Sequence, residues 1–167
     1  DLNDKKIKVI IQNPKNSEKS LLFSQYTLYE VVTKEMDWSV QRRYSDFDWL
    51  RNILSKLYPR IFIPPMAKKK QGPKRFEQDF INKRMKSMQF FIDEIMENEE
   101  LKTSEALIAF LSFNDRSQFE KKMKDLNNYV PSQYCEDLKT IDGKLNILND
   151  DYNENYYINI NNYLNLR

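Results

Sequence analysis

A change in the hydrophobic pattern near residue 44 limits, more than any other feature, what this chain can fold into. Before it, apolar and β-branched residues form three short segments, at 7–11, 21–33 and 38–44, with polar turns between them. Such segments predict strands, and the short turns predict antiparallel neighbours. After it, apolar residues recur every three or four positions, which is typical of helices. We therefore expect an α+β fold, in which a three-stranded antiparallel β-meander precedes a helical subdomain.

An extended arm separates the first two predicted helices. The first helix follows Ser45, which we expect to be its N-cap, and it ends before Pro59. The segment "IFIPPM" at 61–66 is predicted to be extended, because a residue that precedes proline avoids helical geometry. Beyond this Pro-Pro arm, the apolar periodicity predicts helices at 74–98, 104–113 and 116–130.

The composition excludes several classes of function. The chain has no histidine, and Cys135 is its only cysteine. Nucleophile systems that need histidine, and metal sites built from histidine or several cysteines, are therefore excluded. The two glycines, Gly72 and Gly143, are too few for a phosphate-binding loop. No apolar run is long enough to span a membrane, and a single cysteine favours a reducing compartment. We expect a non-enzymatic cytoplasmic protein with no metal and no cofactor.

Positive charge is concentrated in one part of the sequence. Residues 42–75 contain ten lysines and arginines but only two aspartates, a net charge of +8, although the whole chain carries only +2. Such a segment is typical of a surface that binds a polyanion, either lipid headgroups or nucleic acid. A solvated lysine-rich loop is the simpler explanation for the run 68–70 taken alone.

Arg84 stands out because the periodicity places it on the apolar face of the predicted helix at 74–98. The main stripe of that face includes Ile81, Met88 and Ile92. A charge that faces a core costs free energy unless it has a partner. Arg84 therefore pairs with a carboxylate, or lies at the edge of the stripe with its guanidinium in solvent, or belongs to a ligand site.

Three segments, in this order, resemble the PX (phox-homology) domain of the sorting nexins. They are "RRYSDFDWLR" at 42–51, "IFIPPMAKKK" at 61–70 and "FEQDFINKRMKSMQFF" at 76–91. The resemblance covers residues 5–112. It implies the PX fold and a module that binds phosphoinositides, most often phosphatidylinositol 3-phosphate, at the cytosolic face of endosomal membranes.

The resemblance also assigns roles to individual residues. It implies that Arg43 binds the 3-phosphate and that the ring of Tyr44 stacks beneath the inositol. Lys69, after the Pro-Pro arm, aligns with the lysine that contacts the 1-phosphate. Arg84 aligns with the arginine that contacts the inositol 4- and 5-hydroxyls. These assignments are chemically sensible, because a planar guanidinium meets two phosphate oxygens at once, whereas an ammonium acts as a point charge.

Further residues of the basic segment are candidates for lipid or membrane contact. The loop after the Pro-Pro arm is short and polar, so we expect adhesion to depend on charge. The candidates are Arg42, Lys68, Lys70, Lys74 and Arg75, although the strand position of Arg42 also points to a peripheral or structural role. Ser45 is a candidate regulatory site, because a phosphate there would compete with the lipid phosphate for Arg43. An ordinary N-cap is the alternative role for Ser45.

Two other functions and an unassigned extension stay open. A PX-like protein-interaction scaffold with weak or bisphosphate-selective lipid binding is one alternative, and a basic nucleic-acid-binding domain is the other. Residues 113–167 form an extension rich in asparagine, in which Leu148, Tyr152, Tyr156, Ile160 and Leu164 recur with helical spacing. We expect this extension to be partly helical. It could begin a BAR-type bundle, fold back on the first domain, or mediate dimerisation or partner binding.

Overall fold

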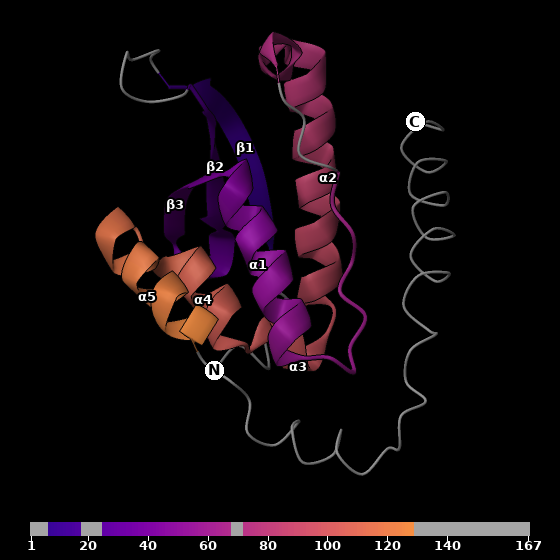
Figure 1. Cartoon of the computed structure of the whole chain (residues 1–167), viewed down its shortest axis with the longest axis vertical. Coiled ribbons are helices and arrows are strands. Elements are labelled where there is room, and N and C mark those ends of the chain that lie inside the picture. Colours follow the sequence, from indigo (N-terminus) through magenta and orange to yellow (C-terminus); the bar gives the residue numbers. More distant parts are fainter. Residues whose placement is uncertain (1–6, 18–24, 68–71, 129–167) are drawn as a thin grey trace. The chain divides into compact units, whose positions relative to one another are not determined.

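The computed structural model describes residues 7–17, 25–67 and 72–128 (Figure 1). Most of the predicted extension, including the helix face from Leu148 to Leu164, lies outside the described residues. The lysines at 68–70 lie outside them as well.

The predicted meander is confirmed. Strands β1 (Val9–Asn16), β2 (Thr27–Thr33) and β3 (Trp38–Arg43) form one antiparallel sheet in the order β1-β2-β3. A short 3-10 turn, Lys34–Met36, joins the last two strands, and Asp37 closes it with a positive φ of 54°. The alternation of buried and outward residues along β2 and β3 follows the pleat, so one face of the sheet carries the apolar side chains.

Strand β1 is longer than the sequence predicts. The polar residues after Ile11 are predicted to be a turn, yet pairing with β2 resumes at Lys15 and Asn16 after an irregularity that begins at Gln12. Asn13, within it, has a positive φ of 49°. Its amide donates to Glu30 on β2 over 2.6 Å. Side-chain hydrogen bonds therefore keep a polar, bulged segment in the sheet, which hydrophobic patterning cannot reveal.

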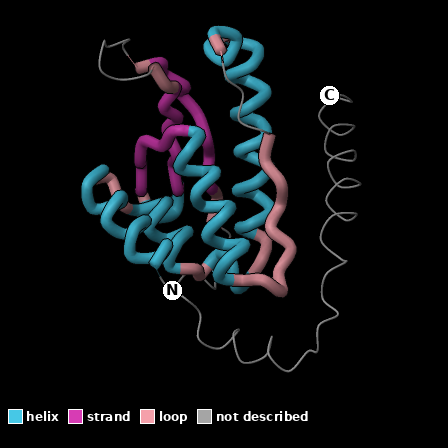
Figure 2. The backbone as a smooth tube through the Cα atoms, viewed as in Figure 1, coloured by secondary structure: helices cyan, strands magenta, loops and turns pink. Residues whose placement is uncertain are grey.

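Helices and the extended arm make up most of the rest of the described chain. The helices are α1 (Tyr44–Leu57), the 3-10 helix η2 (Pro73–Phe76), α2 (Gln78–Met96), α3 (Glu99–Lys102), α4 (Glu105–Ser112) and α5 (Arg116–Asn128). Between α1 and η2 the predicted extended arm is present, and Figure 2 shows it running back along α2. Helix α2 begins four residues later than predicted, because Glu77 adopts an extended conformation after the 3-10 turn.

The prediction that Ser45 caps the first helix is wrong. Helix α1 begins at Tyr44, two residues earlier than predicted, and Arg43 occupies the N-cap position. The Asp46 carboxylate accepts the Arg43 backbone N–H over 2.9 Å, so an acidic side chain three residues into the helix satisfies this donor. Ser45 lies exposed in the first turn.

The core lies between the apolar face of the sheet and the helices. Helix α2 packs along β1, whereas α1 and α4 pack against β3 (Figure 1). The side chain of Gln89 on α2 closes the free edge of β1. It accepts the N–H of Ile11 over 2.8 Å and donates to the carbonyl of Val9 over 2.9 Å. Two backbone groups on the free edge of β1 are thus paired as a neighbouring strand would pair them.

Arg42 is buried, and this corrects its assignment as a candidate for membrane contact. Only 1% of the residue is exposed. Its guanidinium donates to the carbonyls of Phe110 over 2.9 Å and Phe113 over 2.6 Å, at the C-terminal end of α4. Its Cζ also lies 4.0 Å from the centroid of the Phe119 ring. Burial lowers the pKa of Arg42 to about 10. The residue therefore joins β3, α4 and α5 by binding orphan carbonyls of a helix end.

Helix α5 packs on the same body as the sheet. The Phe119 ring is fully buried and meets the Trp49 ring edge to face, with centroids 5.5 Å apart. The Trp49 indole donates to the Asn127 side chain over 3.0 Å, and Lys56 donates to the Asn127 carbonyl over 2.6 Å. Residues 116–128 thus belong to one compact unit with the sheet. The division into domains at residues 112 and 113 stays a prediction.

Candidate functional site

Tyr44 and Arg84, two of the predicted site residues, are in direct contact. Tyr44 is the first residue of α1, and Arg84 lies in the second turn of α2. The Arg84 Cζ is 4.2 Å from the centroid of the Tyr44 ring and 4.4 Å from that of the Phe80 ring. Aromatic faces stabilise a guanidinium at this distance. Two helices that are separated in sequence by the arm are thus joined at these side chains.

The Arg84 guanidinium is buried without a carboxylate partner among the described residues. Its Nε and Nη2 atoms have no hydrogen-bond partner in that part of the chain, and neither has the hydroxyl of Tyr29. Burial raises the pKa of Tyr29, and the Arg84 guanidinium, which lies close to the Tyr29 hydroxyl but outside hydrogen-bonding geometry, opposes that rise. Buried donors without partners are costly in a folded protein. Of the alternatives open for Arg84, ion pairing with a described carboxylate is therefore excluded, and a ligand site is favoured.

The end of the Pro-Pro arm is fixed beside the same tyrosine. The Tyr44 hydroxyl donates to the carbonyl of Ala67, and the Ala67 N–H donates to the Ser87 hydroxyl on α2 over 3.2 Å. Further back, Arg51 Nε donates to the carbonyl of Pro64 over 3.1 Å. The arm is therefore held between α1 and α2 up to Ala67. The predicted residue Lys69, with its neighbours Lys68 and Lys70, lies outside the described residues.

Arg43 ends strand β3 directly before Tyr44, and its side chain is 42% exposed. Its Nε lies 3.5 Å from Asp46 Oδ1, and its Cζ lies 5.9 Å from the centroid of the Tyr26 ring. The Asp46 side chain is only 1% exposed and also accepts Arg116 Nη1 over 2.7 Å. Arg43 is thus the partly open arginine of the pair at positions 42 and 43, whereas its neighbour belongs to the core.

Tyr44 and Arg84 meet between α1 and α2, whereas the Arg43 side chain, at the end of β3, contacts Asp46 and Tyr26 instead. This corner can be compared with known proteins. Residues 30–114, which run from within β2 to just after α4, match the family model of the PX domain. The chain belongs to the PX domain family. A three-stranded antiparallel sheet followed by helices is the PX fold, so the resemblance of the three sequence segments and the predicted fold class are both confirmed.

The PX domain has relatives among the sorting nexins and among solved structures. Sorting nexin-30 of Xenopus tropicalis is 36% identical over 126 residues, which cover 65% of this chain and 28% of that protein. A designed CISK-PX domain matches with a TM-score of 0.57 and 28% identity, over 64% of this chain and 99% of that one. The SNX-BAR Mvp1 tetramer matches with a TM-score of 0.61 and 28% identity, over 74% of this chain and 35% of that one. The matches cover less than a third of each sorting nexin-30.

The remaining basic candidates are only partly described in this PX domain. Lys74 lies exposed in η2, whereas the side chain of Arg75 is outside the described part of the chain. No described helix is long and apolar enough to cross a membrane. Within the described ranges, no group of acidic, histidine or cysteine side chains is arranged to hold a metal ion.

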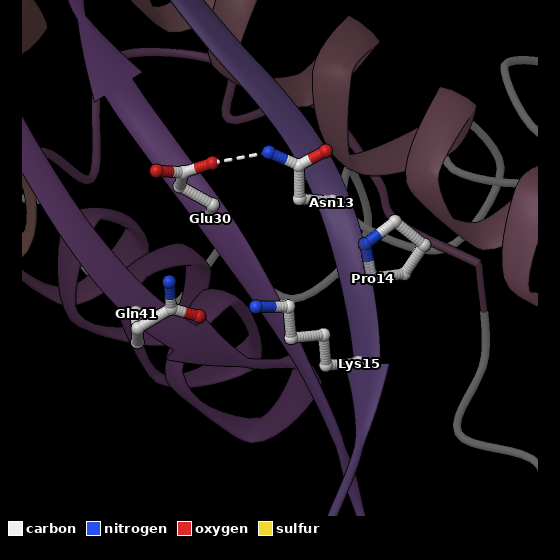
Figure 3. Close-up of a pocket in the computed structure, with 5 residues that line it drawn as sticks. All are labelled: Asn13, Pro14, Lys15, Glu30 and Gln41. Atoms are coloured by element: carbon white, nitrogen blue, oxygen red, sulfur yellow. Dashed lines mark hydrogen bonds between the residues drawn. The ribbon is translucent and has the colours of Figure 1, made fainter.

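A separate hollow lies on the outward face of the PX sheet and includes none of the predicted lipid-binding residues (Figure 3). Its volume is about 630 Å³, and it is lined by Asn13, Pro14, Lys15, Glu30 and Gln41. The Glu30 carboxylate accepts hydrogen bonds from Asn13, Gln12 and Ser39, and these hold its pKa below the usual range. The Glu30 carboxylate is thus already hydrogen-bonded to side chains of the protein itself.

Sequence reasoning missed several residues that build this corner. Phe80 contacts the Arg84 guanidinium, Ser87 holds the arm, and Asp46 binds two arginines. The buried face of α2 was the one available signal for Ser87, because a small polar residue within an apolar stripe needs a hydrogen-bond partner.

Proposed function

We propose that this PX domain is a non-enzymatic membrane-recruitment module that binds phosphatidylinositol 3-phosphate at the cytosolic face of endosomes. Membership of the PX family, with sorting nexin relatives, supports phosphoinositide binding in membrane trafficking. The observation that carries the proposal is the buried Arg84 guanidinium, whose unpaired donors lie against the ring of Tyr44. A ring of hydroxyls over that tyrosine would supply the acceptors that the described protein lacks.

Each side chain has a role that follows from its chemistry. Arg43 is partly open at the end of β3 and can meet two oxygens of a phosphomonoester. Tyr44 offers a flat apolar surface to the inositol ring, and Arg84 donates to the ring hydroxyls. Lys69 follows the fixed end of the arm by two positions and provides a point charge for the diester phosphate.

The other basic residues are proposed to hold the domain to the anionic leaflet without specificity. These residues are Lys68, Lys70, Lys74 and Arg75. Basic residues near such a surface contribute about 1 kcal/mol each. This attraction weakens with salt, because added ions screen exposed charges.

Self-association or partner binding through residues 113–167 is a further proposal, supported by the tetramer in which a related SNX-BAR protein was solved.

A vesicle panel tests the function. The protein is mixed with phosphatidylcholine vesicles that each contain one phosphoinositide, and the bound fraction is measured by sedimentation. We expect saturable binding that is tightest for phosphatidylinositol 3-phosphate. Tighter binding to bisphosphates would support the scaffold alternative, and binding no better than to phosphatidylserine would overturn the proposal. A gel shift with single-stranded nucleic acid at physiological salt tests the remaining alternative.

Replacing Arg84 with methionine separates lipid binding from stability. Because the guanidinium is buried without described hydrogen bonds at Nε and Nη2, we expect the free energy of unfolding to stay within about 1 kcal/mol of wild type, or to rise. Binding to phosphatidylinositol 3-phosphate vesicles should fall at least about tenfold, because charge-assisted hydrogen bonds are lost. Lys83→Met, at the exposed neighbouring position, is the control. A loss of several kcal/mol in Arg84→Met alone would instead make Arg84 a structural residue.

A phosphate mimic at Ser45 tests the regulatory hypothesis. Ser45 is exposed in the first turn of α1, two residues from Arg43, so Ser45→Asp should leave the fold intact. We expect its vesicle binding to be about fivefold weaker, which corresponds to roughly 1 kcal/mol of competition near a protein surface. Ser45→Ala should bind like wild type. Equal binding by Ser45→Asp and wild type would end the hypothesis.

A further inference from the structure

A single buried carboxylate, that of Asp46, links helix α5 to the backbone and side chain of Arg43. Asp46 Oδ2 accepts Arg116 Nη1 over 2.7 Å and the Arg43 backbone N–H over 2.9 Å. Asp46 Oδ1 lies 3.5 Å from Arg43 Nε. The carboxylate is almost completely buried, whereas both guanidinium groups are partly exposed. Two positive side chains therefore share one negative charge that water screens poorly.

Helix α5 lies beyond the part of the chain that the PX family model matches. That match ends at residue 114, and α5 covers Arg116–Asn128. Its contacts with the body nevertheless include the buried ring of Phe119 and the hydrogen bonds at Asn127. A second ion pair joins Lys122 to Glu105 on α4, away from Asp46. The helix is thus docked by several contacts, of which only the Arg116 pair involves Asp46.

We propose that Arg116 is a positioning residue for headgroup binding, because its pairing with Asp46 leaves Arg43 available for a phosphate. This inference rests on the proposed function. With Arg116 in place, Asp46 divides its negative charge between two guanidinium groups, and Arg116 Nε also binds Glu120 Oε1 over 2.7 Å. Without it, the unshared carboxylate draws Arg43 into a closed ion pair, and the ligand phosphate must compete with Asp46 for the same guanidinium.

The arrangement couples the docking of α5 to the lipid site. If docked α5 raises the affinity of Arg43 for a phosphate, the bound phosphate stabilises docked α5 by the same factor. The chain that follows Asn128 is therefore attached to an element whose docking depends on whether a headgroup is bound.

The first experiment compares two single variants of the full chain. Each removes one positive charge from α5, Arg116→Gln at Asp46 and Lys122→Gln at Glu105. We expect Arg116→Gln to bind phosphatidylinositol 3-phosphate vesicles about fivefold more weakly than Lys122→Gln, near the lower end of coupling between linked sites. Equal affinities would overturn the proposal.

The second experiment removes the competing carboxylate. Asp46→Asn keeps an acceptor for the Arg43 backbone N–H but no longer carries a negative charge. Added to Arg116→Gln, it should restore the affinity to within about twofold of wild type, since Arg43 is freed again. A double variant as weak as Arg116→Gln would show that Arg116 acts only by holding α5, and this overturns the proposal.

Wild type and Arg43→Ala are measured alongside these variants. If wild type binds and Arg43→Ala does not, while Arg116→Gln binds like wild type, the coupling is wrong and the proposed function stands. If wild type itself fails to bind these vesicles, the proposed function fails and the inference fails with it.

Trp49 fluorescence in a Trp38→Phe background reports whether α5 stays docked, because Trp49 contacts Phe119 and Asn127.

Discussion

Replacing Arg43 with alanine is expected to weaken binding to phosphatidylinositol 3-phosphate vesicles by at least about 100-fold, since two charge-assisted hydrogen bonds contribute roughly 3 kcal/mol or more. The Arg43 side chain is 42% exposed, so its loss removes little from the core. Its backbone N–H, which caps α1 by donating to Asp46, remains in the variant. We therefore expect an intact fold with a defective site, measured by vesicle sedimentation together with a thermal unfolding curve.

Arg60→Ala is the matched control for this prediction. Arg60 is an exposed arginine in the same basic segment, so the substitution makes the same change in charge. We expect it to weaken adhesion at most about fivefold, the share of one basic residue near an anionic surface. If Arg43→Ala and Arg60→Ala bind equally well, Arg43 does not bind the phosphate.

The neighbouring substitution, Arg42→Ala, is expected to lower the free energy of unfolding by about 3–5 kcal/mol. The guanidinium donates to the carbonyls of Phe110 and Phe113, and it fills space against the Phe119 ring. Alanine would leave buried acceptors unpaired and a cavity between β3, α4 and α5. Urea unfolding followed by tryptophan fluorescence measures the change.

Arg43→Ala is the control for that measurement, because it removes the same side chain one position along the strand. We expect it to change the free energy of unfolding by less than about 1 kcal/mol, as is usual for surface substitutions. Arg42→Ala should therefore mainly lower the free energy of unfolding, whereas Arg43→Ala should mainly weaken vesicle binding. A stability loss of similar size in both variants would contradict the division between a structural and a binding arginine.

Strand alternation accounts for part of this division. Alternate residues of a strand share a face, and β3 buries Val40 and Arg42 together. The sequence could not identify the partners of Arg42, since these are main-chain carbonyls near the end of α4. Any residue supplies a carbonyl, so no pattern of side chains marks those acceptors. Membrane contact therefore stayed open for Arg42 until its burial was known.

At the start of α1, the local sequence predicted the wrong capping residue. Local rules favoured Ser45 as the cap, because serine precedes a helical pattern there. The structure instead uses Asp46, whose carboxylate also binds Arg116 from α5. That second partner lies seventy positions further along the chain. The carboxylate that caps α1 thus also binds a distant helix, and the sequence around residue 45 gives no information about that partner.

The sequence by itself determined the order of strands and helices, the extended Pro-Pro arm and the absence of histidine and P-loop chemistry. These properties follow from periodicity and proline, which act over a few neighbouring residues, and from composition, which does not depend on position in the sequence. Periodicity also placed Arg84 on a buried face, but only the tertiary structure brought it against Tyr44 and Phe80 without a described carboxylate. Likewise, only the packing of α4 and α5 decided which of two adjacent arginines stays partly open. Pairing between charges depends on distance in space, and residues far apart in sequence come within that distance only in the folded chain.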